Sequence, residues 1–225
     1  MNRAESILIG LFVGIACPLL LFVFCSWTVA AITIYHVLLL PSRVIIIAGF
    51  TGLGIGLVMD IVWLKRWVRR FYTANTYLMI AVYLAMSVVA LAFFMGLPIG
   101  SLVLGILAGA YVGRRQFHTG GSGSACSKAA HKVGLFAGLV TTAETLPIGL
   151  LALDEPSIIN FVRSFLGLEE SVIAGPLGVT LVAAMCVVLF VLQLSCTLIA
   201  ATFTFSLGKE DGQASAPADA QQVHR

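Results

Sequence analysis

The chain has 225 residues, of which 60% are hydrophobic and only 10% are charged, and its mean hydropathy is +1.04. A soluble domain carries about a quarter of its residues as charged side chains, so this composition excludes a soluble globular protein. The net charge of +3 does not indicate a nucleic-acid partner, because the basic residues lie in short groups between apolar stretches. The composition predicts an all-α fold, a polytopic membrane helix bundle whose main partner is the lipid bilayer.

Six apolar stretches approach the length of about 20 residues that a helix needs to cross a bilayer. We expect transmembrane spans at about residues 7–34, 44–64, 76–95, 98–112, 133–153 and 177–207. The bundle would therefore occupy residues 1–207, followed by a disordered cytoplasmic tail at 208–225. Pro18 predicts a kink in the first span, whereas Pro98 begins the fourth span, where a helix tolerates proline. A cleavable signal peptide is the alternative for the N-terminus, but its apolar core is usually only about 7–15 residues long.

The Lys and Arg residues are divided unequally between the two sides of such a bundle. With six spans, the termini and the loops after the second and fourth spans share one side. That side holds Arg3, Lys65, Arg66, Arg69, Arg70, Arg114, Arg115, Lys128, Lys132, Lys209 and Arg225. The other side holds only Arg43 and Arg163, together with the acidic residues between 154 and 170. The positive-inside rule therefore places both termini in the cytoplasm, and we expect the protein in the cell membrane.

Residues 113–132, between the fourth and fifth spans, are rich in Gly, Ser and basic residues. We expect a flexible cytoplasmic linker, because a phosphate-binding loop would need Gly immediately before Lys128, where the chain has Ser127. Three residues of this segment could bind zinc but match no zinc-site spacing: His118, Cys126 and His131. The five cysteines form no CxxC pair, so we predict neither a metal site nor a disulfide framework, and no cofactor.

Residues 156–170 lie on the opposite side, between the fifth and sixth spans. At helical spacing, five apolar residues of this segment form one stripe: Ile158, Phe161, Val162, Phe165 and Leu166. The pattern predicts an external amphipathic helix. Two interpretations are equally compatible with it, a helix that lies in the membrane interface and a helix that caps the bundle.

Glycine is frequent inside the predicted spans. The second span contains GFTGLGIG at 49–56, the fourth contains GSLVLGILAGAYVG at 100–113, and the first and fifth contain GLFVG and GLFAG at 10–14 and 134–138. Small residues four positions apart line one helix face and let two backbones approach closely, which is how helices associate in lipid. We therefore expect tight packing along these faces. The matching pentapeptides do not indicate an inverted three-plus-three repeat, which would relate the first span to the fourth.

A carboxylate lies in the middle of the fifth span, in the stretch TTAETLP at residues 141–147. Glu144 is about 18 Å of helical rise from Lys132 and about 15 Å from Asp154, and none of the predicted spans contains Lys or Arg. An unpaired ionised carboxylate at this depth would cost several kcal/mol. Glu144 must therefore be protonated, face a hydrated cavity, or hold a cation.

The residues around this carboxylate suggest a binding site. Pro147 cannot donate a backbone hydrogen bond to the carbonyl one turn earlier, the threonines of the stretch supply hydroxyls, and the sixth span carries Gln193 near its middle. The predicted site consists of Glu144, Thr141, Thr145 and Gln193. In the alternative, a neutral Glu144 hydrogen-bonds Gln193 and Thr141 only to hold the helices together, and Pro147 is a simple kink.

Asp60 is a second candidate, in the second span and five residues before Lys65. This spacing corresponds to about 7 Å of helical rise, so the carboxylate could reach lipid headgroups, water or Lys65. We favour such an anchoring role over a role in transport.

Three classes of function remain. A transport component or small channel for a small solute or cation fits best, because a compact glycine-rich bundle carries a mid-membrane carboxylate beside a proline that is expected to break the helix. The alternative is a non-catalytic structural or assembly subunit, whose partner would be another membrane subunit or a second copy of the chain. A membrane enzyme ranks third, because the sequence contains neither HExxH nor GxSxG.

Overall fold

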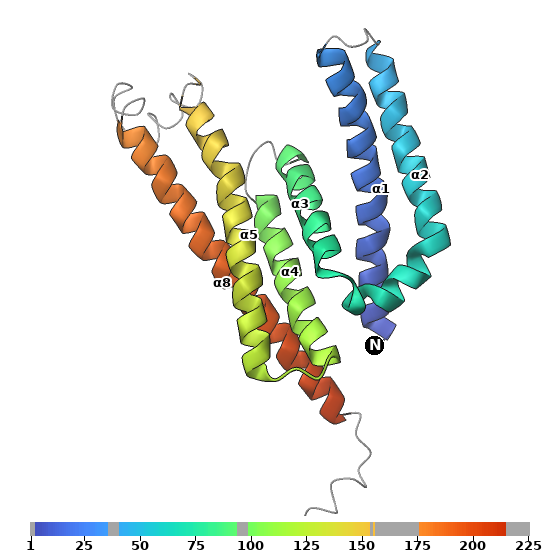
Figure 1. Cartoon of the computed structure of the whole chain (residues 1–225), viewed down its shortest axis with the longest axis vertical. Coiled ribbons are helices and arrows are strands. Elements are labelled where there is room, and N and C mark those ends of the chain that lie inside the picture. The colour runs from blue at the N-terminus through green and yellow to red at the C-terminus, as the bar shows by residue number, and fades with distance from the viewer. Residues whose placement is uncertain (1–2, 36–40, 94–98, 154, 156–175, 215–225) are drawn as a thin grey trace, which may run out of the picture. The chain divides into compact units, whose positions relative to one another are not determined.

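The structure is a computed structural model that describes residues 3–35, 41–93, 99–153, 155 and 176–214. All regular structure in these residues is helical, and four of the helices are long and apolar enough to cross a membrane. The predicted all-α, membrane-type helix bundle is therefore confirmed, and the protein is a multi-pass membrane protein. The chain forms two compact units, Met1–Val89 and Ala90–Arg225, which are described separately (Figure 1).

The first unit is built on a hairpin of two long helices, α1 (Arg3–Ile34) and α2 (Ser42–Arg70), which run antiparallel (Figure 1). The helix α1 continues through Pro18. A short 3₁₀ turn, η1 (Phe71–Thr73), follows α2 and leads to α3 (Thr76–Phe93), which crosses the boundary between the units.

Three glycines of α2 make the close approach of α1 possible. A Cβ atom at Gly56 would overlap the backbone of Pro18, and one at Gly52 would overlap the backbone of Leu21. Gly49 lies in the same way against α1 side chains, so the glycine face predicted for this helix is confirmed. Because a methyl group has no room at these positions, only glycine permits this spacing of the two backbones.

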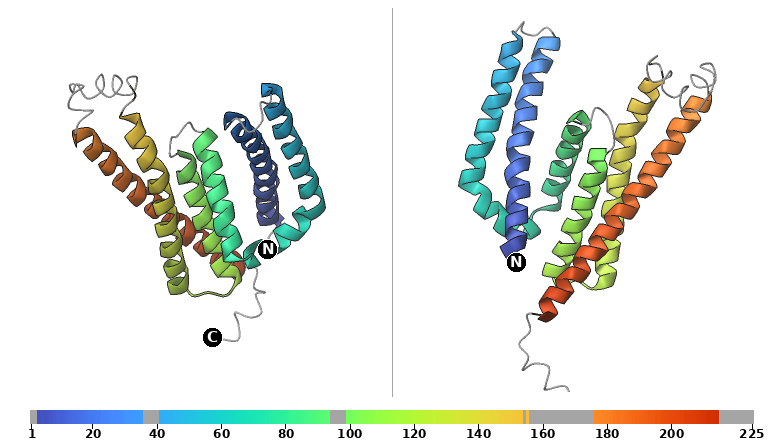
Figure 2. Two further views of the ribbon diagram at one scale, coloured as in Figure 1. Left: turned by 45° about the horizontal axis from the view of Figure 1, so that its top comes forward. Right: turned by 180° about the vertical axis from the view of Figure 1, so that it is seen from behind.

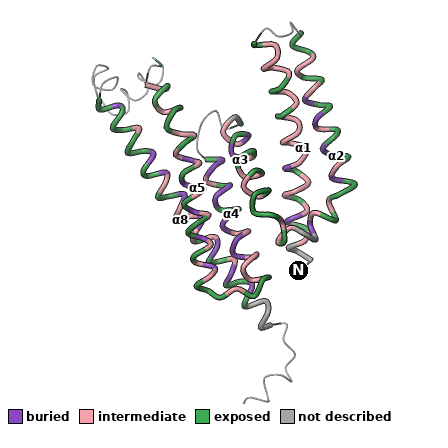
Figure 3. The backbone as a smooth tube through the Cα atoms, viewed as in Figure 1, coloured by how far each residue is buried: buried purple, intermediate pink, exposed green. Residues whose placement is uncertain are grey.

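The second unit consists of α4 (Ile99–His118), α5 (Gly123–Ala152) and α8 (Pro176–Ala214). The helix α8 packs against both others, running parallel to α4 and antiparallel to α5, as the opposite views of Figures 1 and 2 show. Glycines again line the contacts, and the residues of α4 that pack on α8 are buried (Figure 3): Gly105, Gly109 and Gly113. Gly134 and Gly138 of α5 face Leu194 and Phe190 of α8. The predicted packing through glycine faces is confirmed here also.

The flexible linker expected at residues 113–132 is wrong. Helix α4 continues to His118 and α5 begins at Gly123, so only four residues connect them. Gly120 has a φ of 70°, and the N–H groups of Gly121 and Gly120 donate to the carbonyls of Gln116 and Phe117. This pattern ends a helix: a glycine in the left-handed conformation turns the chain, so that the N–H groups after the helix can donate to its last carbonyls.

The start of α5 is capped in the complementary way. The hydroxyl of Ser122 accepts a hydrogen bond from the N–H of Ala125 at 3.3 Å. The Gly-Gly-Ser stretch therefore combines a helix stop with a helix start, and its composition reflects these two caps rather than flexibility.

The described helices also change one other predicted boundary. The helix α8 extends to Ala214, seven residues into the segment expected to be a disordered tail from residue 208, and residues 215–225 lie outside the described part. The external amphipathic segment at 156–170 and the helix start at Pro98 also lie outside the described residues.

The described helices are not six equal membrane spans. The four long apolar helices are α1, α2, α5 and α8, whereas α3 has a shorter apolar stretch, Thr76–Leu91. The helix α4 has 20 residues, but it ends in two arginines, a glutamine and a histidine. Six crossings therefore remain a prediction.

Within each unit, the antiparallel arrangement brings basic residues to one end. In the first unit, the end of α2 with the sequence KRWVRR lies beside the start of α1, which begins at Arg3 (Figure 1). In the second, the ends of α4 and α8 and the start of α5 lie together and carry Arg114, Arg115, Lys128, Lys132 and Lys209. Each unit thus has the charge asymmetry from which we predict a cytoplasmic side.

Candidate functional site

Glu144 of α5 faces a serine of the neighbouring helix α4. The hydroxyl of Ser101 donates a hydrogen bond of 3.4 Å to carboxylate oxygen Oε2 of Glu144. Ser101 is buried, whereas Glu144 is half-buried. The carboxylate therefore points toward the bundle and not entirely toward lipid.

Gln193 of α8 reaches the same serine from the other side. Its side-chain Nε2 donates to the backbone carbonyl of Ser101 at 2.9 Å, and its exposed fraction is 0%. Ser101 therefore joins Glu144 to Gln193, and polar groups of three helices meet in the interior of the second unit.

A glycine makes room for this contact. The Nε2 atom of Gln193 occupies the position that a Cβ atom at residue 105 would need, so Gly105 is required for the amide to lie beside α4. Gly105 follows Ser101 by four residues and both lie on the face of α4 that packs on α8. The same glycine face that permits tight packing thus forms one wall of the polar cluster.

The predicted threonines line α5 next to Glu144. Thr141 has an exposed fraction of 0%, and its hydroxyl donates to the Ala137 carbonyl at 3.0 Å. The hydroxyl of Thr145 donates to the Thr141 carbonyl at 2.7 Å. Because each hydroxyl donates within its own helix, its oxygen lone pairs remain available to accept a hydrogen bond or to coordinate a cation.

The helix break predicted at Pro147 is wrong. The helix α5 is continuous from Gly123 to Ala152, with Pro147 inside it. Proline still lacks the N–H that would bond to the Ala143 carbonyl, but one missing bond does not interrupt a helix whose neighbouring turns are intact and packed on α8. The site is therefore a polar cluster on a continuous helix.

Asp60 lies in the other unit, on the face of α2 that packs against α1. Its exposed fraction is 5%, and neither of its oxygens has a hydrogen-bond partner in the described part of the chain. The thiol of Cys17 in α1 lies beside it. Within the described residues Asp60 makes no hydrogen bond to Lys65, and an anchoring role through headgroups or water stays a prediction.

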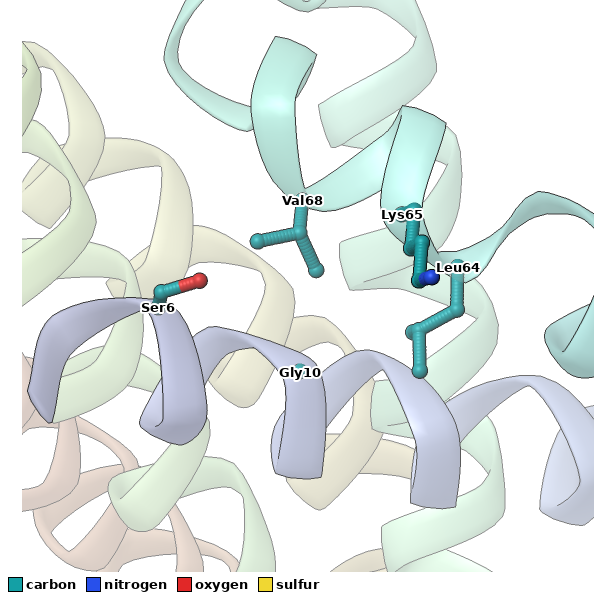
Figure 4. A pocket seen from close by; sticks show the side chains of 5 residues that line it. All are labelled: Ser6, Gly10, Leu64, Lys65 and Val68. Carbon is teal, nitrogen blue, oxygen red and sulfur yellow. The ribbon is translucent and has the colours of Figure 1, made fainter. Parts of the chain in front are cut away.

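One cavity in the first unit lies at the basic end of the hairpin. It has a volume of about 480 Å³ and is lined by Ser6, Gly10, Leu64, Lys65 and Val68. Figure 4 shows the side chains of α2 reaching across this space toward the backbone of α1. The cavity is mainly apolar, with Lys65 and Ser6 as its polar side chains.

Two residues of the polar cluster were not predicted from the sequence. Ser101 could have been found, because it lies four residues before Gly105 on the predicted glycine face. Thr197, four residues after Gln193, is also fully buried, and its hydroxyl donates to the Gln193 carbonyl at 2.8 Å. Cys17 carries no local signal that would have paired it with Asp60.

The chemistry of the cluster is that of oxygen ligands. One carboxylate, several hydroxyls and one amide can share a proton or hold a small hard cation. Within the described residues, no group of three His, Cys, Asp or Glu side chains could hold a metal ion. Comparisons with protein-family models, with curated proteins and with solved structures found no match to the chain.

Proposed function

We propose that the protein is a membrane transport component or small channel for a small cation or solute, and that Glu144 is its binding site. One observation carries the proposal: the Ser101 side chain and backbone connect Glu144 of α5 to Gln193 of α8 inside a bundle of three helices. An ionisable group inside a membrane bundle is expensive to bury, which is why such groups are typical of ion and substrate pathways.

The surroundings of Glu144 support a site that can bind and release a small cation or a proton. Half-burial leaves the carboxylate accessible to a small ion, while Thr141 and Gln193 are fully buried and fixed by hydrogen bonds. A fixed set of polar groups beside one accessible carboxylate is suited to bind a cation or proton with little rearrangement. If the carboxyl group had only a structural role, an amide in its place would make the same helix contacts equally well.

Thermal unfolding of the purified protein in detergent tests this site. We would compare wild type, Glu144→Gln and Glu144→Leu between about pH 5 and pH 9, each with and without Na⁺, K⁺, Mg²⁺ or Ca²⁺. We expect wild type to be stabilised by at least one cation or by a change of pH. Glu144→Gln keeps the shape and the hydrogen-bonding capacity, so it should remain folded but lose that response.

Glu144→Leu separates binding from helix association. It should unfold more easily by about 1 kcal/mol, because it loses the hydrogen bond to Ser101. If wild type responds to neither pH nor any of the four cations, and Glu144→Gln superimposes on it, the carboxylate is only a packing group. The proposed site would then be rejected, in favour of a structural subunit.

A further inference from the structure

A second buried carboxylate lies in the first unit and has no role in the site around Glu144. Asp60 has an exposed fraction of 5% on the α1-facing side of α2, and apart from the weakly polar Cys17 thiol beside it neither of its oxygens has a hydrogen-bond partner within the described residues. An ionised carboxylate without partners is strongly disfavoured in a dry apolar environment. Asp60 must therefore be neutral, or something that reaches it from outside the hairpin must compensate its charge.

The contact between α1 and α2 differs on the two sides of Asp60. Toward the α1–α2 connection the helices touch, because Cβ atoms at Gly49, Gly52 and Gly56 would overlap α1. Toward the basic end the contact is loose. A Cβ atom at Gly14 would meet nothing within 4 Å, and one at Gly10 would come no closer than 3.9 Å to Val68.

Gly14 lies on the face of α1 that looks toward α2. It is four residues from Gly10, which faces Val68, and four residues from Pro18, which faces Gly56. The empty space beside Gly14 is therefore located in the contact between the two helices. Pro18 also lacks the N–H that would satisfy the Gly14 carbonyl, so a polar acceptor borders this space.

The cavity at the basic end lies one helical turn from this space. It is lined by Gly10 of α1 and by Leu64 and Val68 of α2 (Figure 4). Leu64 is one helical turn from Asp60, and Gly10 is one turn from Gly14, which corresponds to about 6 Å of rise in each helix. From the basic end of the hairpin, the cavity comes first, then the empty space beside Gly14, then Asp60. The tight contact begins beyond Asp60, at Gly56.

The titratable groups near Asp60 are few. The side chain that faces it from α1 is Cys17, and Cys25 lies two turns farther along α1, against Gly52. On α2 the nearest cation in sequence is Lys65, at the cavity. Two carboxylate oxygens and one thiol are too few ligands for a metal ion, which usually takes four or more. A proton needs only one oxygen.

We propose that Asp60 is a proton-binding site at the closed end of a water path that enters the α1–α2 hairpin from its basic end, past Lys65, Gly10 and Gly14. Asp60 takes up a proton from this path and returns it to the same side, because the contact at Gly49, Gly52 and Gly56 blocks the other direction. The site is separate from Glu144 and does not depend on the function proposed for it.

The two native cysteines of α1 provide a matched test of the water path. Each of two variants retains one native cysteine, and the other four are replaced by Ala. One variant keeps Cys17, which lies beside Asp60, and the other keeps Cys25, which lies at the tight contact with Gly52. A small, membrane-impermeant methanethiosulfonate would be added to sealed vesicles of either orientation. Cys17 should react from the side that carries Lys65, at least about ten-fold faster than Cys25, because such reagents attack thiolates in contact with water. Equal rates, an unreactive Cys17, or reaction from the opposite side would overturn the path.

Infrared spectroscopy tests the proton itself. In protein carrying Glu144→Gln, we would follow the carbonyl-stretch band of protonated carboxyl groups between about pH 5 and pH 9. A component of this band should weaken as the pH rises, should shift in D₂O, and should be missing when Asp60→Asn is added. If Asp60→Asn does not fold, Asp60→Glu takes its place and should move this component of the band instead of removing it. A band that is constant in pH, or that Asp60→Asn leaves intact, would contradict a site that exchanges protons.

Discussion

At the scale of single residues, Ser101 decides how the second unit holds its carboxylate. Its hydroxyl donates to Glu144 and its carbonyl accepts from Gln193, so one small residue on α4 connects α5 and α8. A larger residue would not fit on a helix face that packs through Gly105 and Gly109. The residue at position 101 must therefore be small and must also carry a hydrogen-bond donor.

Ser101→Ala should weaken the second unit only slightly and remove the Ser101 contact of Glu144. The change removes the hydroxyl and keeps the backbone acceptor of Gln193, so we expect a loss of about 0.6–1 kcal/mol. Unfolding in mixed detergents would measure it. The control is Ser206→Ala, because Ser206 is exposed and donates only to the Phe203 carbonyl of its own helix. If both variants unfold alike, the contact between Ser101 and Glu144 does not contribute to stability.

The sequence was sufficient to find Glu144, Thr141, Thr145 and Gln193, because a polar residue within an apolar stretch is conspicuous. It was not sufficient to find their connection. Which face of each helix meets its neighbour depends on three helices packing together, and the interaction through Ser101 becomes visible only then. Asp60 illustrates the same limit, because its distance from Lys65 in the sequence indicated an exposed end, whereas helix rotation turns the carboxylate inward.

At the scale of helices, glycine sets how close two backbones come, and its position within a helix decides its effect. Gly52 and Gly56 of α2 touch α1, whereas Gly54, between them, has nothing within 4 Å of where its Cβ would be. A pattern of four glycines in eight residues, GFTGLGIG, thus contains positions with opposite requirements. The sequence alone could predict a glycine face but could not tell which glycines belong to it.

Gly56→Ala and Gly54→Ala therefore form a matched pair. The first forces the α2 backbone away from Pro18 and should destabilise the hairpin by about 1–3 kcal/mol. The second meets empty space and should be neutral or stabilising by up to about 1 kcal/mol, because alanine is the better helix former. Thermal unfolding in detergent compares them. Equal effects would mean that α1 and α2 do not pack in this register.

The turn between α4 and α5 has its own test. Gly120→Ala places a Cβ at a φ of 70° and should destabilise the second unit by about 1 kcal/mol. Gly123→Ala, three residues later at the start of α5, meets nothing within 4 Å and should have little effect. A protein that tolerates both changes equally would have the flexible connection expected from the composition, and not the capped turn.

At the scale of the whole molecule, the predicted orientation is the same whether both or neither of the two shorter helices cross the membrane, whereas five spans would separate the termini. If both α3 and α4 cross, there are six spans, and if neither crosses, four remain. Both numbers are even, so the basic ends of the helices stay on the same side in either case. The positive-inside rule therefore predicts both termini in the cytoplasm for four spans as well as for six.

Labelling of single cysteines can test this orientation. Ser122→Cys, in the turn between α4 and α5, should react with an impermeant reagent only after the membrane is opened. Ser157→Cys, between α5 and α8, should react on intact cells. Both would be introduced into a chain without its native cysteines. Reaction of Ser122→Cys on intact cells would reverse the orientation.

The role of Glu144 is tested most directly by flux through the protein in liposomes. Wild type, Glu144→Gln and Ser206→Ala would be reconstituted at equal density, and the entry of H⁺, Na⁺ and K⁺ would be followed with ion-sensitive dyes under an imposed gradient. We predict that wild type and Ser206→Ala pass at least one of these cations, and that Glu144→Gln passes it at least about ten-fold more slowly, a loss of about 1.4 kcal/mol. If wild type is no faster than protein-free liposomes for any of the three cations, or if Glu144→Gln equals wild type, Glu144 is not a transport site for these cations.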